Sequence, residues 1–266
     1  MPAPLKSNLE LLRQRRENAA ASDFKFWKPK DDGKYIIRFL PPASEEDMFY
    51  EETAQYKLGD KYFYAPHAKK QPDPIYEYYR ALWKKGTPEA EALAREIKPV
   101  KKFLYNIIVR EELGKASENP TKVFVYMSGV QLNQKICDYM FDPDYGDLTD
   151  TEAGYDFVIT KTTDGQFPNY DQSKPRKNPS PLFDDQDMIE ETLKQVKDLA
   201  AEVEYCTYDQ LKEELALYLK NRNGEDGPVA ASTTARPAAS SPKAAAPAAS
   251  EDMNDYEKDL LSKLDD

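Results

Sequence analysis

The sequence contains few of the residues on which metalloenzymes and disulfide-bonded folds depend. Its 266 residues include two cysteines, Cys137 and Cys206, and one histidine, His67. The cysteines lie far apart and outside any CxxC pair, which argues against a disulfide framework and against a cysteine-based metal site. A single histidine also disfavours multi-histidine metal binding and most histidine-dependent catalysis.

Long apolar runs and catalytic motifs are lacking as well. No stretch is long enough to span a bilayer, and the first 18 residues are charged throughout, unlike a signal peptide. The sequence has no P-loop, GxSxG, HExxH or dinucleotide-binding glycine pattern. We therefore expect an intracellular protein that is not an enzyme and does not associate with membranes.

The charge is strongly acidic in sum but is distributed unevenly. The formal net charge is -11, yet the first 30 residues carry seven basic and three acidic side chains. The last 16 residues carry two basic and seven acidic side chains. A basic front and an acidic end predict that an anionic partner binds near the front of the chain.

Composition divides the chain into regions with different expected structures. We expect an α+β protein with an OB-fold-like β-barrel core, an inserted small subdomain, a helical C-terminal segment and a disordered acidic tail. The expected boundaries are an arm at 1–30, a core at 31–183 with its insertion at about 54–97, a helical segment at 184–222, a linker at 223–250 and a tip at 251–266.

Hydrophobic periodicity predicts the elements of the core. Strands are expected at 34–40, 61–64, 103–109, 122–127 and 154–161, the last followed by the turn signal Asp164-Gly165. Helices are expected at 75–85, 89–97 and 131–140. In the helical segment, Ile189, Leu193, Val196, Leu199 and Val203 repeat at helical spacing, and Leu211, Leu215 and Leu219 begin a second helix.

The most informative pattern is the interleaving of aromatic residues with lysine and arginine. There are 18 tyrosines and 11 phenylalanines, and they crowd the expected strands next to basic residues. Cations neutralise phosphates, and exposed rings stack on unpaired bases in a way that tolerates any base sequence. Because strands also use such rings as packing, we expect most of them to be buried and a minority to face a binding surface.

The two ends of the chain predict interaction elements. Leu5, Leu9 and Leu12 fall on one helical face, followed by Arg13, Arg15 and Arg16. Residues 224–250 are rich in Ala, Pro and Ser and predict a flexible linker. The acidic tip carries Leu260, Leu261 and Leu264, flanked by Asp259 and Asp265, so it can compete with DNA for cations and can also bind a partner protein.

Several motifs in the core resemble one protein family. Tyr35-Ile-Ile-Arg-Phe-Leu-Pro41, Tyr105-Asn-Ile-Ile-Val109, Lys122-Val-Phe-Val-Tyr126 and Gly165-Gln-Phe-Pro-Asn-Tyr-Asp-Gln-Ser-Lys174 occur in that order. They resemble segments of the helix-destabilising single-stranded DNA-binding proteins of T-even-type tailed bacteriophages. The resemblance spans nearly the whole chain.

The resemblance implies an OB fold that binds single strands cooperatively in replication, recombination and repair, in the cytoplasm of the infected host cell. It implies self-association on DNA through the arm, where we place Lys6, Arg13, Arg15 and Arg16, and recruitment of replication and recombination proteins through the tail. The residues expected to bind single-stranded DNA are Arg38, Tyr78, Lys98, Lys101, Lys102, Tyr105, Tyr126, Phe167, Tyr170 and Lys174.

The sequence departs from the family pattern in two places. The best-known member has a zinc site with one histidine and three cysteines, but the matching stretch here, about 54–79, offers only His67. Tetrahedral zinc needs about four such ligands. We therefore expect no cofactor, with Tyr62, Phe63, Tyr64, Tyr76 and Tyr79 packing the subdomain instead. The arm also lacks the family's compact basic-then-hydroxyl cluster, of which Lys6-Ser7 is a remnant.

Two other functions compete with DNA binding. The chain could be a protein-interaction scaffold, in which the arm and the tip bind proteins and the core binds no nucleic acid. An OB-fold nuclease is disfavoured because the sequence shows no metal-carboxylate motif. Quenching of intrinsic fluorescence by oligo-dT separates the scaffold from the DNA-binding protein, since stacking on bases quenches tryptophan and tyrosine emission.

Overall fold

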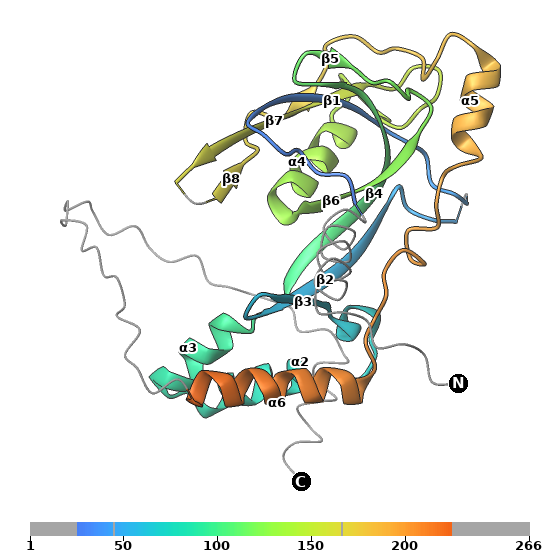
Figure 1. Cartoon of the computed structure of the whole chain (residues 1–266). Coiled ribbons are helices and arrows are strands. Elements are labelled where there is room, and N and C mark those ends of the chain that lie inside the picture. Colours follow the sequence, from blue (N-terminus) through green and yellow to red (C-terminus); the bar gives the residue numbers. More distant parts are fainter. Residues whose placement is uncertain (1–25, 45, 166, 225–266) are drawn as a thin grey trace, which may run out of the picture. The chain divides into compact units, whose positions relative to one another are not determined.

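The computed structural model describes residues 26–44, 46–165 and 167–224, which form one antiparallel sheet and five α-helices (Figure 1). The strands are β1 (Gly33–Phe39), β2 (Tyr50–Leu58), β3 (Lys61–Tyr64), β4 (Val100–Glu112), β5 (Lys115–Ala116), β6 (Val123–Gly129), β7 (Asp156–Asp164), β8 (Phe167–Asn169) and β9 (Lys174–Pro175). The helices are α2 (Pro74–Lys85), α3 (Pro88–Glu96), α4 (Val130–Phe141), α5 (Gln186–Leu193) and α6 (Tyr208–Gly224), with a 3-10 turn, η1, at Pro66–Lys69. None of these helices is long and apolar enough to cross a membrane.

Strand β4 organises the sheet because it pairs along both edges. Its first half pairs with β2, its second half pairs with β1 along the same edge, and its other edge pairs with β6. Strand β1 then pairs with β7, and β7 pairs with β8 and β9. The register shifts between Ile36 and Ile37, where a bulge bends the strand. The result is a curled antiparallel half-barrel.

Alternation along β4 explains why both faces of the half-barrel are buried. Phe103, Tyr105 and Ile107 point into the interior, where α4 and residues of β1, β6 and β7 complete the core. Leu104 and Ile108 point to the outer face. A continuous apolar run is the pattern expected of a strand covered on both sides.

The outer face is covered by a segment that the sequence analysis had assigned to a helix. Helix α5 ends at Leu193, and no helix is present from there to Tyr208. In this segment Leu199 and Val203 pack against Leu104 and Val125 of the sheet. The predicted helix across Val196, Leu199 and Val203 is therefore wrong. In this non-helical segment, Leu199 and Val203 are buried against the sheet.

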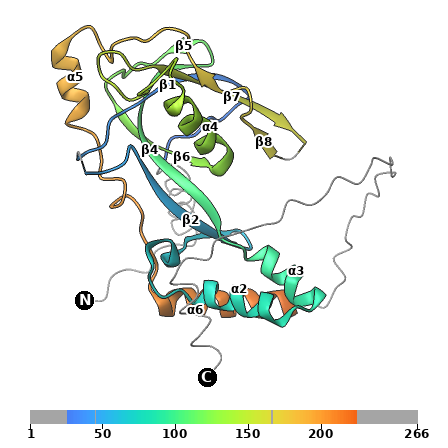
Figure 2. The same cartoon turned by 180° about the vertical axis from the view of Figure 1, so that it is seen from behind.

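A second core joins the inserted elements to the last helix. Ile75 and Leu82 of α2 and Leu93 of α3 pack with Leu211 and Leu215 of α6. Figures 1 and 2 show α2 and α6 side by side, in agreement with their contacts. The core of α2 and α3 thus depends on a helix more than a hundred residues later in the chain.

Most of the other expected elements are confirmed within a few residues. The Asp164-Gly165 turn connects β7 and β8, with Gly165 at a φ of 68°, a conformation that favours glycine. Strand β2 was missed, because its sequence YEETAQYKL is largely polar and does not alternate cleanly. The predictions for Lys6, Arg13, Arg15 and Arg16 and for the linker and tip lie outside the described residues.

Candidate nucleic-acid interface

A groove lies where the start of β4, the junction of β6 with α4, and the β8 hairpin meet. Its lining is formed by Val100, Lys102, Gly129, Val130, Gln131, Leu132, Lys135, Pro168, Tyr170 and Asp171. Two of these are lysines and one is an acidic residue. We refer to this set of residues as the groove.

Backbone pairing holds the two sides of the groove in place. Lys102 of β4 faces Gly129 across the β4–β6 ladder, so the cation lies at the point where α4 begins. Burial lowers the pKa of the Lys102 ammonium from its ordinary value. A partly desolvated cation interacts more strongly with an anion than one in bulk water does, because the local dielectric is lower.

The third side is the β8 hairpin and the loop that follows it. Phe167 is 76% exposed although it is a large apolar residue, and Tyr170 is partly buried against the half-barrel core. The Lys135 ammonium donates a hydrogen bond to the carbonyl of Asp171, which ties α4 to this loop. The Tyr170 ring therefore lines the groove together with two lysines, and the exposed Phe167 ring belongs to the residue next to Pro168 of the same lining.

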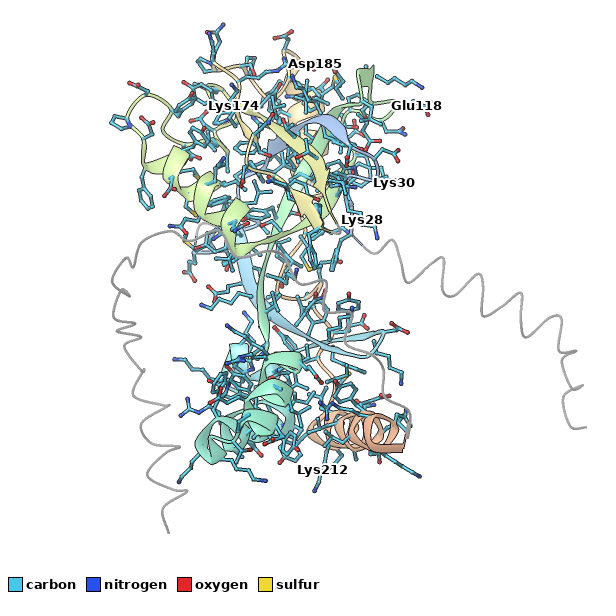
Figure 3. All side chains as sticks on the ribbon, turned by 90° about the vertical axis from the view of Figure 1, so that its left-hand side faces the viewer. Lys28, Lys30, Glu118, Lys174, Asp185 and Lys212 are labelled. Atoms are coloured by element: carbon cyan, nitrogen blue, oxygen red, sulfur yellow. The ribbon has the colours of Figure 1, made fainter. Side chains whose placement is uncertain are left out.

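The predicted lysines occupy different positions around β4. Lys98 is exposed just before the strand, Lys101 is exposed and pairs with Glu52 at 2.9 Å, and Lys102 lines the groove. Lys174 is exposed on β9 and is not part of the groove lining (Figure 3). Tyr78 lies on α2, partly buried against the second core, and also does not line the groove.

Two predicted aromatic contacts belong to the interior instead. Tyr105 is fully buried and Tyr126 is 3% exposed, and their rings stack at a centroid distance of 6.2 Å. The Tyr105 hydroxyl donates to the side chain of Asn133. Burial raises the pKa of both phenols well above the ordinary value. The expectation that these two rings face DNA is therefore wrong for this conformation, since they form packing between β4 and β6.

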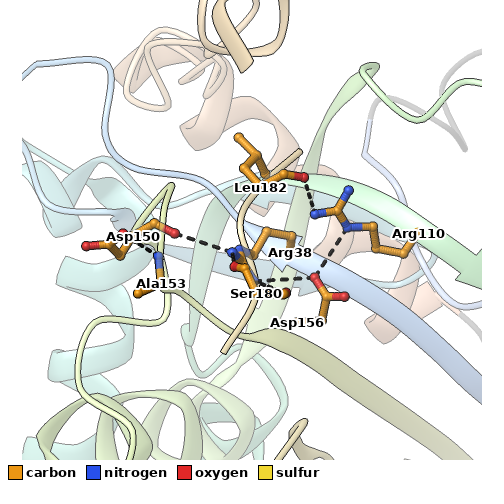
Figure 4. A network of polar contacts seen from close by, with 7 residues as sticks. All are labelled: Arg38, Arg110, Asp150, Ala153, Asp156, Ser180 and Leu182. Carbon is orange, nitrogen blue, oxygen red and sulfur yellow. Dashed lines mark hydrogen bonds and ion pairs between the residues drawn. The ribbon is translucent and has the colours of Figure 1, made fainter. Parts of the chain in front are cut away.

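Arg38 is likewise not a surface cation. Its side chain is fully buried and donates to Asp156 Oδ1 at 3.4 Å and to the carbonyl of Ser180 (Figure 4). Arg110 Nε donates to the same Asp156 oxygen at 3.3 Å, and Arg110 also donates to the carbonyl of Leu182. The network fastens the loop at 180–182 to β1 and β4. Arg38 therefore has a structural role, which corrects its assignment to the DNA-binding surface.

The sequence analysis missed part of the groove. Lys135 was not selected, although it follows Gln131 by four positions in the expected helix and so shares a face with it. Val100 and Val130 are about half exposed, and nothing in their sequence context distinguishes them from core valines. The meeting of β4, α4 and β8 is set by the fold and could not be predicted from local pattern.

The stretch that resembles a zinc subdomain is organised around a carboxylate. The carboxylate of Asp73 accepts a hydrogen bond from Tyr56 Oη at 2.8 Å and lies 3.1 Å from His67 Nδ1. The His67 ring stacks on Tyr76 at 4.0 Å. Within the described ranges, no three His, Cys, Asp or Glu side chains gather in a way that could hold a metal ion. These residues do not fit a zinc site, and we derive no role for zinc.

The groove combines two lysines with the Tyr170 ring, the two classes of side chain that contact single-stranded nucleic acid. Residues 31–218 match the family model described as gp32 DNA binding protein like. The chain belongs to this family of non-enzymatic single-stranded DNA-binding proteins. No curated protein sequence matches the chain.

Proposed function

We propose that the chain binds single-stranded DNA of any base sequence in the groove, with the half-barrel acting as an OB-type platform. The observation that carries this proposal is that the Tyr170 ring lines the groove together with Lys102 and Lys135, while the exposed Phe167 ring lies next in sequence to Pro168 of the same lining. Rings supply stacking and lysines supply phosphate neutralisation, and neither contact depends on base identity. The family resemblance supports cooperative action in replication, recombination and repair of a phage genome inside the host cell.

Replacing Phe167 by alanine tests the exposed ring that adjoins the groove lining at Pro168. We expect oligo-dT to bind more weakly by about 1–3 kcal/mol, because one stacked base loses its platform. Phe141→Ala is the matched control, since Phe141 is 87% exposed at the far end of α4 and neither it nor its sequence neighbours line the groove. Fluorescence titration at two salt concentrations measures both variants. Equal losses in the two variants, or equal affinity of the wild type for duplex and single strand, would contradict the proposal.

The scaffold hypothesis gives a different result in the same titration. If the chain binds only proteins, oligo-dT will not quench its intrinsic fluorescence at either salt concentration. Membership of a DNA-binding family favours the groove over the scaffold.

We further propose that the acidic tip competes with DNA for the lysines of the groove. The described chain supports this proposal at the end of α6, where Arg222 donates to Glu96 at 3.0 and 3.2 Å. Glu96 lies two residues before Lys98, so the last described helix ends beside the basic start of β4. The tip is joined covalently to the same chain by residues 225–250, and such linkage raises the effective concentration of a competing anion.

Removing residues 251–266 should strengthen duplex destabilisation, because the competing polyanion is lost. The melting temperature of a DNA duplex with the protein in excess measures this, and it should fall further with the truncated chain. A variant with Leu260, Leu261 and Leu264 changed to alanine is the control, since it keeps the acidic charge and should melt the duplex like the wild type. Unchanged melting after truncation would reject the competition.

A further inference from the structure

A second concave surface lies on the half-barrel, apart from the groove. It is lined by Phe26, Trp27, Lys28, Lys30, Asp31, Tyr35, Glu112, Leu113, Lys122, Val123, Phe124, Val125 and Lys197. Four lysines outnumber two acidic residues in this set, and aromatic rings are interleaved with them. We refer to it as the edge pocket.

The edge pocket and the groove lie at the two ends of one strand. Strand β6 pairs with β4 along one edge, and along its other edge the described chain makes a single parallel bridge, between Trp27 and Tyr126. Lys122 and Phe124 at the start of β6 line the edge pocket, and Gly129 at its end lines the groove. Six residue steps of about 3.3 Å separate the two ends by about 20 Å.

Aromatic rings connect the two concave surfaces. Trp27 packs edge-on against Tyr126 at 5.4 Å and against Tyr35 at 5.8 Å. From the groove side, Tyr170 packs against the same core that contains Tyr35 and Tyr126. The partly exposed Trp27 ring therefore lies over the middle of β6, between the two concave surfaces, on a base of buried rings.

The charges of the edge pocket suit a phosphate. Lys28 and Lys30 are both exposed and lie close together (Figure 3), and Lys197 is exposed on the opposite segment. The Lys122 ammonium lies 5.0 Å from the centre of the Phe124 ring. Of the two acidic residues, Glu112 accepts a hydrogen bond from Trp27 Nε1 at 2.6 Å, which engages one of its two carboxylate oxygens.

We propose that a DNA strand bound in the groove at the end of β6 continues toward the start of β6 and places backbone phosphate in the edge pocket. The inference rests on the proposed function and extends it, because it assigns a second contact region and the direction of the strand. The acidic tip is another anion that could enter the pocket. The position of the pocket on the same strand as the groove favours DNA.

The double variant Lys28→Gln/Lys122→Gln tests the edge pocket through its dependence on strand length. With an oligo-dT of about four nucleotides, which the groove alone can hold, the variant should bind like the wild type. With an oligo-dT of about 16 nucleotides, each lost phosphate contact should weaken binding about fivefold at 0.1 M salt and reduce the salt slope by about 0.7.

The control variant is Lys212→Gln/Lys220→Gln, which removes the same charge from α6, away from both surfaces (Figure 3). It should match the wild type at both lengths, and equal urea midpoints will show that all variants are folded. Equal loss at both lengths, or no loss at either, would overturn the inference. Loss of binding to a labelled peptide of residues 251–266, with DNA binding intact, would assign the pocket to the tip and also overturn it. If the wild type binds neither oligomer, the groove itself is rejected.

Discussion

Replacing Asp156 by alanine should lower the free energy of unfolding by about 4 kcal/mol, the cost typical of a broken buried ion pair. The variant would leave the fully buried Arg38 guanidinium without its counter-charge. Burial already lowers the pKa of Arg38, and Asp156 is the main charge that opposes this effect. Urea unfolding followed by circular dichroism measures the loss.

Arg38→Met is the informative companion variant. It removes the buried cation itself, and Arg110 still neutralises Asp156, so it should cost less than Asp156→Ala. Because Arg38 has no exposed surface, the salt dependence of DNA binding should stay as in the wild type. If Arg38→Met made the affinity for DNA depend less steeply on salt, Arg38 would contact DNA, and this would contradict its burial.

Asp73→Ala should lower the free energy of unfolding of the elements at 54–97 by about 3 kcal/mol, because it removes a helix cap and leaves buried donors without an acceptor. Asp73 caps α2 by accepting from the backbone N–H groups of Ile75 and Tyr76, and it also accepts from buried Tyr56. Thr87→Ala is the matched control, since Thr87 caps α3 through Ala90 N–H alone and should cost about 1 kcal/mol. Hydrogen exchange over residues 74–97, together with urea unfolding, measures both. A loss in Asp73→Ala no larger than in Thr87→Ala would show that the network contributes nothing beyond the cap.

The stability that the Asp73 carboxylate provides should depend on pH, and the stability of the protein should not change when a chelator is added. Burial alone would raise the pKa of Asp73, but hydrogen bonds from His67, Tyr76 and Tyr56 outweigh it and hold the pKa below its ordinary value. Its stabilising contribution is therefore complete above the unfolded pKa of about 3.9 and is lost as pH falls through the folded value. Chelation should leave the unfolding midpoint unchanged, and a lowered midpoint would show that the subdomain holds a metal.

The core strands and helices could be predicted from the sequence, but their partners could not. The apolar run in β4 and the turn at Asp164-Gly165 are local signals, and both gave the correct element. The pairing of β4 with β1, β2 and β6 joins segments that are distant in the chain. The extended path after Leu193 follows from burial against the sheet, which helical spacing of the same apolar residues cannot distinguish from an amphipathic helix.

In the candidate site, too, residue types could be predicted from the sequence, but their positions in space could not. Of the residues that the interleaving of rings and lysines selected as DNA contacts, Lys102 and Tyr170 line the groove, and their contact with DNA stays a prediction. The pattern also selected Tyr105, Tyr126 and Arg38, which are buried, because residue type does not reveal which face of a strand points inward. Lys135 and Trp27 gain their places only when α4 and the chain at 26–30 meet β6.

The apolar core that α2 and α3 share with α6 can form only after α6 has been synthesised. Leu211 follows Ile97 by 114 positions, yet both belong to one apolar core. At roughly 5–20 residues per second, the ribosome needs about 6–23 s to make the intervening chain. During that time Ile75, Leu82 and Leu93 are not yet packed against α6, so the nascent chain exposes apolar side chains of the kind that holdase chaperones bind. A stop codon anywhere before Leu211 would make that exposure permanent.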